Sequence, residues 1–154
     1  MRRILLTIAP LVVVAGCAAT ESASMMAPRG PLETAVWPLD KVELKKFDWG
    51  ELRLCHFTAE THGTKDTLVG YVTLNPGMEN HPPHQHAEEE FILITRGKGK
   101  LHVAGKDYPA AEGDMFYAAP WVFHGITNDS SEELSFFVIK WNGKNGPPPP
   151  KPEK

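Results

Sequence analysis

Short apolar runs broken by turn-forming residues constrain this sequence more than any other feature. Each run has four to eight residues, and glycine, proline or asparagine clusters stand between the runs at residues 75–77, 96–99, 104–106 and 128–131. Glycine supplies positive φ and Asx side chains close local turns, so these clusters favour chain reversals. The domain shows no helical period and no internal repeat. The pattern predicts an all-β fold of seven or eight short strands, at residues 42–49, 52–58, 67–74, 89–95, 100–103, 114–118 and 134–141.

The length of 154 residues suits one ordinary domain with terminal extensions. We divide the chain into a leader at residues 1–16, a small and polar tether at 17–38, a β-domain at 39–143 and a proline-rich tail at 144–154, which we expect to be disordered. The formal charge is −3, and removal of Arg2 and Arg3 with the leader would leave 14 basic against 19 acidic residues, a charge near −5. No basic patch favours nucleic acid as a partner.

The first residues read as an export signal. Arg2 and Arg3 precede an apolar run over residues 4–15 that is too short to span a bilayer. The run ends at Val14-Ala15-Gly16-Cys17, which resembles a bacterial lipobox. The resemblance implies lipidation of Cys17 and an exported lipoprotein held at a membrane by its lipid anchor, at the outer membrane or periplasmic face of a diderm host. An ordinary signal peptide cleaved near Ala18 is the alternative, and it also implies export.

A group of histidines and acids predicts a metal site. Strand alternation places His84 and His86 on one face, where two imidazoles can converge on one ion. A carboxylate and the distant His124 would complete a mixed nitrogen and oxygen shell suited to one divalent transition metal: Fe, Mn, Ni, Co, Cu or Zn. Glu88 and Glu90 share strand parity, so periodicity alone leaves both open as the carboxylate. The alternative is a metal-free cavity that the histidines merely line.

These residues resemble the two motifs of the cupin superfamily. The first motif matches from His84 to its closing glycine, and the second keeps its ligand spacing but has Ala119 and Trp121 where the family has proline and glycine. The resemblance covers about residues 67–140 and implies a jelly-roll β-barrel with the metal inside its open end. It also favours Glu90 over Glu88 as the ligand, so that Glu88 and Glu89 are expected to be solvated. The matching positions are Gly77, His84, His86, Glu90, Gly97, Gly113, His124 and Asn128.

The resemblance implies two classes of function. One is a metal-dependent, dioxygenase-like oxygenase or oxidase, or an isomerase, acting on a small oxygenated molecule. The other is a binding module in which the metal holds a ligand without turnover. His81, Tyr117 and Trp121 are the candidates for ligand contact, and catalytic residues beyond the metal ligands are not identifiable. Pairing of cupin barrels through their sheets implies a homodimer.

Overall fold

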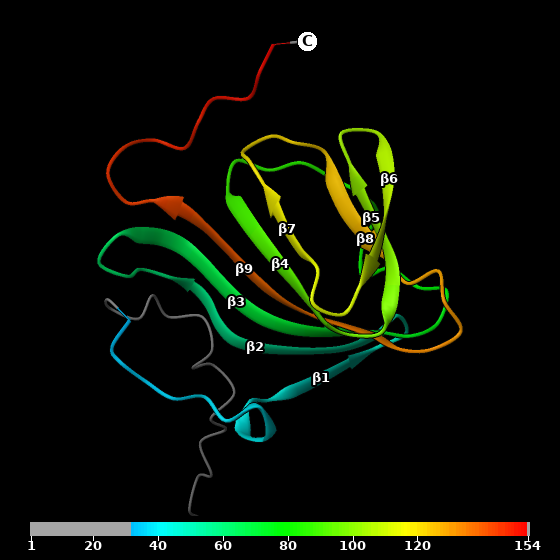
Figure 1. Cartoon of the computed structure of the whole chain (residues 1–154). Coiled ribbons are helices and arrows are strands. Elements are labelled where there is room, and N and C mark those ends of the chain that lie inside the picture. The colour runs from blue at the N-terminus through cyan, green and yellow to red at the C-terminus, as the bar shows by residue number, and fades with distance from the viewer. Residues whose placement is uncertain (1–31, 154) are drawn as a thin grey trace, which may run out of the picture.

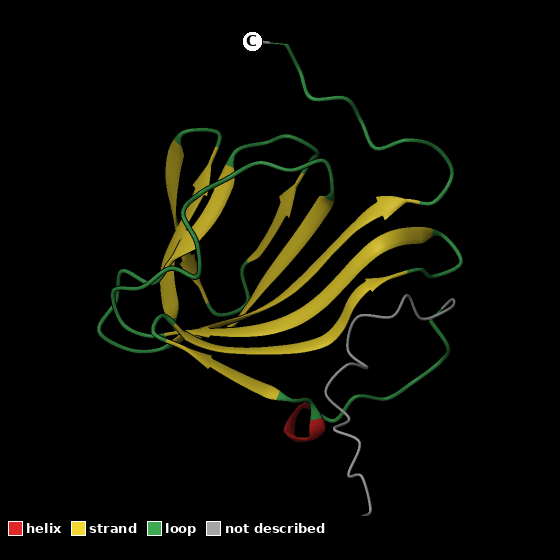
Figure 2. Cartoon of the chain, turned by 180° about the vertical axis from the view of Figure 1, so that it is seen from behind, coloured by secondary structure: helices red, strands yellow, loops and turns green. Residues whose placement is uncertain are grey.

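The computed structural model describes residues 32–153, with only the backbone described at residues 56–59. The expected leader, Cys17 and most of the expected tether lie outside the described residues. Within them the regular secondary structure is almost wholly β-strand, as predicted (Figures 1 and 2). A single 3-10 turn, η2 (Leu39–Lys41), precedes the strands β1 (Leu44–Phe47), β2 (Gly50–Ala59), β3 (Thr64–Leu74), β4 (Glu89–Arg96), β5 (Lys98–Val103), β6 (Lys106–Ala111), β7 (Met115–Ala118), β8 (His124–Thr127) and β9 (Leu134–Gly143).

The strands form two antiparallel sheets. Six strands run in the order β1-β2-β3-β9-β4-β7, and three run in the order β6-β5-β8. Figure 1 shows the long, curved β2, β3 and β9 beneath the smaller sheet. No strand ladder joins the two sheets within residues 32–153. The expected barrel is therefore not closed by hydrogen bonds, although its two-sheet arrangement is consistent with a jelly roll.

Two strands were missed by the sequence pattern. β6 carries a proline and mostly exposed side chains, so it lacks the alternation that marks a half-buried strand. β8 has only four residues, of which three are buried. Pairing with β5 on both sides explains why these segments are extended despite weak local signals.

The hydrophobic core lies between the two sheets. Alternate residues of β3, β4 and β9 point inward from the large sheet, and single residues of β5, β6 and β8 meet them from the small one. The buried core consists of Val72, Leu74, Ile92, Ile94, Leu101, Ala110, Ile126, Leu134, Phe136 and Val138. This packing fixes the separation of the sheets and hence the position of side chains at the end of the core.

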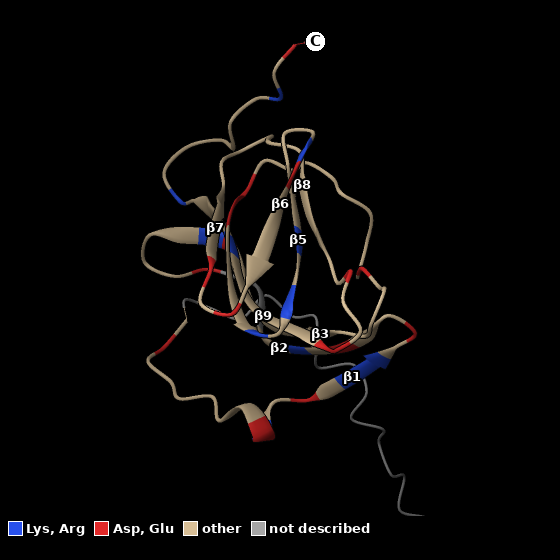
Figure 3. Ribbon diagram, turned by 45° about the vertical axis from the view of Figure 1, so that its right-hand side comes forward, with Lys and Arg blue, Asp and Glu red and all other residues tan. Residues whose placement is uncertain are grey.

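Charged residues are spread over both sheets. In Figure 3 the basic parts of β1 and β5 and several acidic segments lie in different regions of the ribbon. In residues 32–153 no helix combines the length and the apolar character that crossing a membrane requires.

Candidate metal centre

The loop before β4 is held against β8 by a pair of backbone hydrogen bonds. The amide of His84 donates to the carbonyl of His124, and the amide of His124 donates to the carbonyl of His84, each at 2.8 Å. Gly125 allows this approach, because a Cβ there would lie 2.9 Å from the Cα of Pro83. The backbone therefore brings two histidines that are 40 residues apart in the sequence to one place.

Three of the four predicted ligands form a compact cluster. One ring nitrogen from each of His84, His86 and His124 lies within 4.8 Å of the other two. The ring centroids are 4.8 to 5.1 Å apart. His124 is almost fully buried, whereas the other two rings are partly exposed. The cluster thus has a buried base and a side open to a ligand.

Hydrogen bonds to carbonyl oxygens fix the tautomers of two rings. Nδ1 of His124 lies 2.8 Å from the carbonyl of Val122, and Nδ1 of His86 lies 3.1 Å from the carbonyl of Glu88. A carbonyl can only accept, so each Nδ1 carries the proton and each Nε2 of a neutral ring presents a lone pair. Such second contacts orient histidines that ligate metals.

Glu90 lies against this cluster and is buried. Its Oε1 is 3.4 Å from Nε2 of His124, and its Oε2 is 3.4 Å from Nε2 of His86. Burial raises the pKa of Glu90, but the two imidazoles outweigh burial and lower it to about 2. The carboxylate is therefore ionised at neutral pH and supplies a negative charge to the cluster.

The histidines respond to this environment in different ways. Burial and the three neighbouring imidazoles lower the pKa of His84 from 6.5 to about 4. Burial also lowers the pKa of His124, but the nearby carboxylate of Glu90 and the hydrogen-bonded carbonyl of Val122 outweigh it, so the net shift is upward. The protein without a cation thus holds one ring neutral and draws a proton toward another.

The donor set fits a divalent transition metal. Nδ1 of His84 and Nε2 of both His86 and His124 are buried atoms without a hydrogen-bond partner. Buried polar atoms are rarely left unpaired, and a cation bound by these two lone pairs and the carboxylate 3.4 Å away would satisfy all three groups. Three imidazoles and a carboxylate are ligands that Fe, Mn, Co, Ni, Cu and Zn accept.

A cavity of about 340 Å³ opens beside the cluster. His84, His124 and Glu90 line it at one end, and mostly apolar side chains of both sheets form its walls. Its other polar lining residues are Asn80, His81 and Lys140. The ring of His81 packs edge-on against His84 with centroids 4.3 Å apart, so this predicted contact residue does lie at the cavity.

The other two residues predicted to contact a ligand lie outside this cavity. Tyr117 is exposed on β7 and donates a hydrogen bond to Glu89 at 3.1 Å. Trp121 has a positive φ of 64°, at the position where the cupin motif has glycine, and its Nε1 donates to the carbonyl of Pro149 in the tail at 2.7 Å. Its side chain is directed to the tail, so neither residue is placed to touch a ligand at the histidines.

Sequence reasoning missed one charged residue at the site, Lys140, and set another, Glu88, aside. Glu88, expected to be solvated, is half-buried, with Oε2 3.4 Å from Nδ1 of His86 and Oε1 3.8 Å from Nζ of Lys140. Lys140 lies opposite Glu90 in the pairing of β4 with β9. Strand parity carried the signal for Lys140, because it follows the inward-facing Phe136 and Val138 at steps of two.

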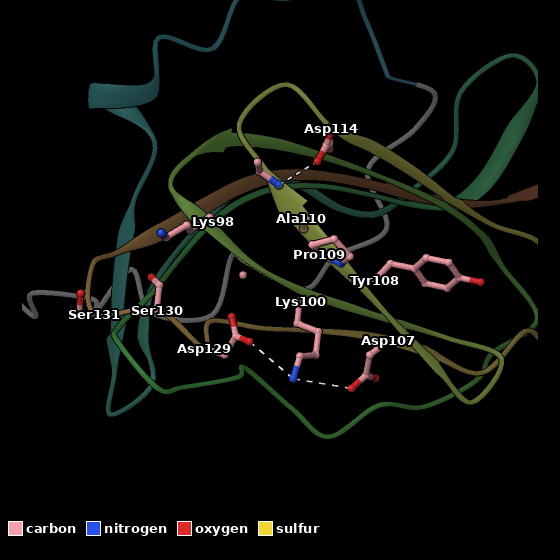
Figure 4. A pocket seen from close by; sticks show the side chains of 12 residues that line it. Lys98, Lys100, Asp107, Tyr108, Pro109, Ala110, Asp114, Asp129, Ser130 and Ser131 are labelled. Atoms are coloured by element: carbon pink, nitrogen blue, oxygen red, sulfur yellow. Dashed lines mark hydrogen bonds and ion pairs between the residues drawn. The ribbon is translucent and has the colours of Figure 1, made fainter.

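A larger hollow of about 770 Å³ lies on the small sheet and has a different character (Figure 4). Nζ of Lys100 stands between Asp107 at 3.6 Å and Asp129 at 3.5 Å. Asp114 accepts a hydrogen bond from the amide of Ala111 at 2.8 Å. The polar groups drawn there are largely paired, and most are exposed.

Part of this chain is similar to known proteins. Residues 70–140 match the family model described as a cupin domain. The chain is 29% identical over 91 residues to the oxalate-binding protein of Thermotoga maritima, which covers 58% of this chain and 75% of that protein. It is 28% identical over 109 residues to auxin-binding protein 1 of Arabidopsis thaliana, which covers 63% of this chain but only 54% of that protein.

A solved structure shows the same fold. A RmlC-like cupin from Shewanella frigidimarina aligns with a TM-score of 0.59 and 16% identity, covering 73% of this chain and 95% of that one. This likeness shows the fold alone, and the cupin-domain match spans just under half of the chain.

Proposed function

We propose, from the cupin match over residues 70–140, that the chain binds one divalent transition metal and holds a small oxygenated molecule beside it. His84, His86, Glu90 and His124 are the proposed ligands. The observation that carries the proposal is the convergence of three unpaired imidazole nitrogens within 4.8 Å, with a buried carboxylate against them.

The chemistry follows from the surroundings of the cluster. A bound metal would supply a Lewis acid or, for a redox metal, a centre for electron transfer. The carbonyls of Val122 and Glu88 hold two imidazoles in the tautomer that ligates. The walls of the cavity are mostly apolar, and a low-polarity surrounding strengthens the electrostatic interactions beside it.

Two activities fit such a site. The first is a metal-dependent oxygenase, oxidase or isomerase. The second is a binding module without turnover, which is favoured by the names of two relatives, an oxalate-binding and an auxin-binding protein. Oxygen uptake, or isomer formation followed by NMR, would distinguish turnover from binding.

The test of the metal site is elemental analysis of the full chain purified without chelators or added metals. We expect about one equivalent of Fe, Mn, Ni, Co, Cu or Zn, and its loss in His84→Ala/His86→Ala. Glu89→Ala is the control, because Glu89 hydrogen-bonds to Tyr117 and does not line the cavity. No metal in the unmodified chain even after reconstitution, or equal loss in the Glu89 variant, would refute the ligand assignment.

We also propose that the chain is an exported lipoprotein lipidated at Cys17, and that it pairs as a homodimer. The support is the apolar leader, the lipobox-like sequence and the family resemblance. Mass spectrometry of the mature N-terminus distinguishes a lipidated Cys17 from cleavage near Ala18, and sedimentation measures the oligomeric state. An unmodified Cys17 within the mature chain would refute lipidation.

A further inference from the structure

We propose that Lys140 anchors the anionic group of the ligand, and that the ligand is a small monoanion with an apolar body. This inference rests on the proposed function, because it names the class of molecule that the cavity beside the metal would take. It combines the position of Lys140 with the charge and the walls of the cavity.

Lys140 is the one lysine or arginine among the residues that line this cavity in the described part of the chain. Cross-strand pairing places it opposite Glu90 on β4 and opposite Leu68 on β3. Residues that lie directly opposite on antiparallel strands share a face of the sheet. Its side chain is 25% exposed, so the ammonium is partly withdrawn from water.

The ammonium of Lys140 has an ion-pair partner but no hydrogen-bond acceptor in the described residues. In the described residues its one acidic contact is Oε1 of Glu88 at 3.8 Å, beyond hydrogen-bond distance, and it donates no hydrogen bond. A lysine ammonium carries three donors, and a partly buried one needs acceptors. Glu88 therefore positions Lys140 beside the metal cluster and leaves its donors available to a ligand.

The charges around the cavity favour a monoanion. A divalent ion and Lys140 would bring three positive charges, against two negative charges on Glu88 and Glu90. One positive charge remains, and a single carboxylate or similar group would balance it. A neutral ligand would leave the lysine with Glu88 as its one acidic contact in the described residues, and without a hydrogen-bond acceptor.

The walls specify the rest of the ligand. Eight large apolar residues line the cavity: Leu52, Leu54, Leu68, Val72, Ile92, Ile126, Phe136 and Val138. A volume of about 340 Å³ accommodates a molecule the size of a substituted aromatic acid, at the lower end of small-molecule sites. Oxalate offers no apolar surface to these walls. We therefore expect an arylacetate-like anion to bind better than a small dianion.

A second polar atom adds specificity. Oδ1 of Asn80, which lines the same cavity, is buried and has no hydrogen-bond partner. It can only accept, so a hydroxyl or amine on the ligand would satisfy it. Lys140 and Asn80 thus select for an anion that also carries a donor.

The experiment measures binding of phenylacetate, its neutral isostere phenylacetamide, and oxalate to the full chain by calorimetry. Lys140→Met keeps the apolar stem and removes the charge. Lys46→Met is the matched control, because Lys46 is exposed on β1 and pairs with Glu51. We expect phenylacetate to bind better than either other probe, and Lys140→Met to weaken it about tenfold or more while Lys46→Met does not.

Metal content is measured on every variant, so that failure of the metal site is distinguishable. Unchanged metal with weakened phenylacetate in Lys140→Met supports the inference. Unchanged phenylacetate affinity in that variant, equal weakening of phenylacetamide, tighter binding of oxalate, or no phenylacetate binding by the unmodified chain would overturn it. A chain that lacks metal but still binds phenylacetate through Lys140 would refute the metal site and leave the anion anchor standing.

Discussion

The hollow on the small sheet and the cavity beside the histidines differ in whether their polar groups already have partners. The groove on the small sheet is the larger, about 770 Å³ against 340 Å³, but its Lys100 already lies between two aspartates. The smaller cavity is lined by two imidazoles with an unpaired buried nitrogen, those of His84 and His124, and by a lysine that donates no hydrogen bond in the described residues. We therefore place the candidate site by its unsatisfied buried groups rather than by volume.

The largest expected effect is loss of the stabilisation that metal binding gives. An ion present at about a thousand times its Kd would raise the free energy of unfolding by about 4 kcal/mol. In His84→Ala/His86→Ala we expect thermal unfolding to become insensitive to a chelator. Lys100→Ala, in the groove, should keep the chelator-dependent shift in Tm. If the Tm of the double variant still changed with chelator, the metal would not be bound by these two histidines.

Asn128 should contribute to stability without contributing to metal binding. It is fully buried, and its Nδ2 lies within 3.1 Å of the carbonyls of Leu74, Asn75 and Glu132. Asn128→Ala leaves buried carbonyls unpaired, so we expect the free energy of unfolding to fall by about 3 kcal/mol in urea titrations. Metal content should be unchanged, and the exposed Ser131→Ala serves as control. Metal loss at intact stability would show that the motif asparagine acts at the site instead.

The free energy of unfolding of the metal-free protein should decrease as the pH falls. The pKa of His84 is about 4 in the folded state and 6.5 in the unfolded state, so the unfolded chain binds more protons between those values. His124, whose pKa is raised, acts in the opposite direction. Because His84 is partly exposed, we discount its effect to about 1 kcal/mol.

Urea unfolding of metal-free protein at about pH 7 and about pH 5 measures the contribution of His84 to the pH dependence of stability. The unmodified chain should lose more stability between the two values than His84→Gln does. An equal loss in both proteins would show that the pKa of His84 does not set the pH dependence.

The smallest effect is expected in the groove. Lys100 is an exposed partner of Asp107 and Asp129, and surface ion pairs of this kind contribute about 0.5 kcal/mol or less. Lys100→Ala should therefore change the urea midpoint little, and less still at high salt. A fall of about 2 kcal/mol in the free energy of unfolding would mean that the contacts of Lys100 contribute far more to stability than a surface ion pair does.

Several features could be predicted from the sequence because they depend on local pattern. Apolar runs and turn residues indicated the β-rich fold, and the spacing of His84 and His86 placed both near one centre. Their roles as ligands, together with Glu90 and His124, stay predictions. Lys140 was missed because strand parity puts it on the inward face but does not say that this face lines a cavity beside the histidines. Glu88 was set aside on the family resemblance, although parity alone left it open.

The sequence by itself determined the element type, the turns and the candidate donor atoms, because these follow from side-chain chemistry over a few residues. Only the tertiary structure decided that His84 meets His124, that Lys140 lies opposite Glu90 and that Trp121 contacts Pro149. Each of these contacts joins segments at least 28 residues apart. Strand register and sheet packing set such contacts, and both depend on the whole core rather than on any one segment.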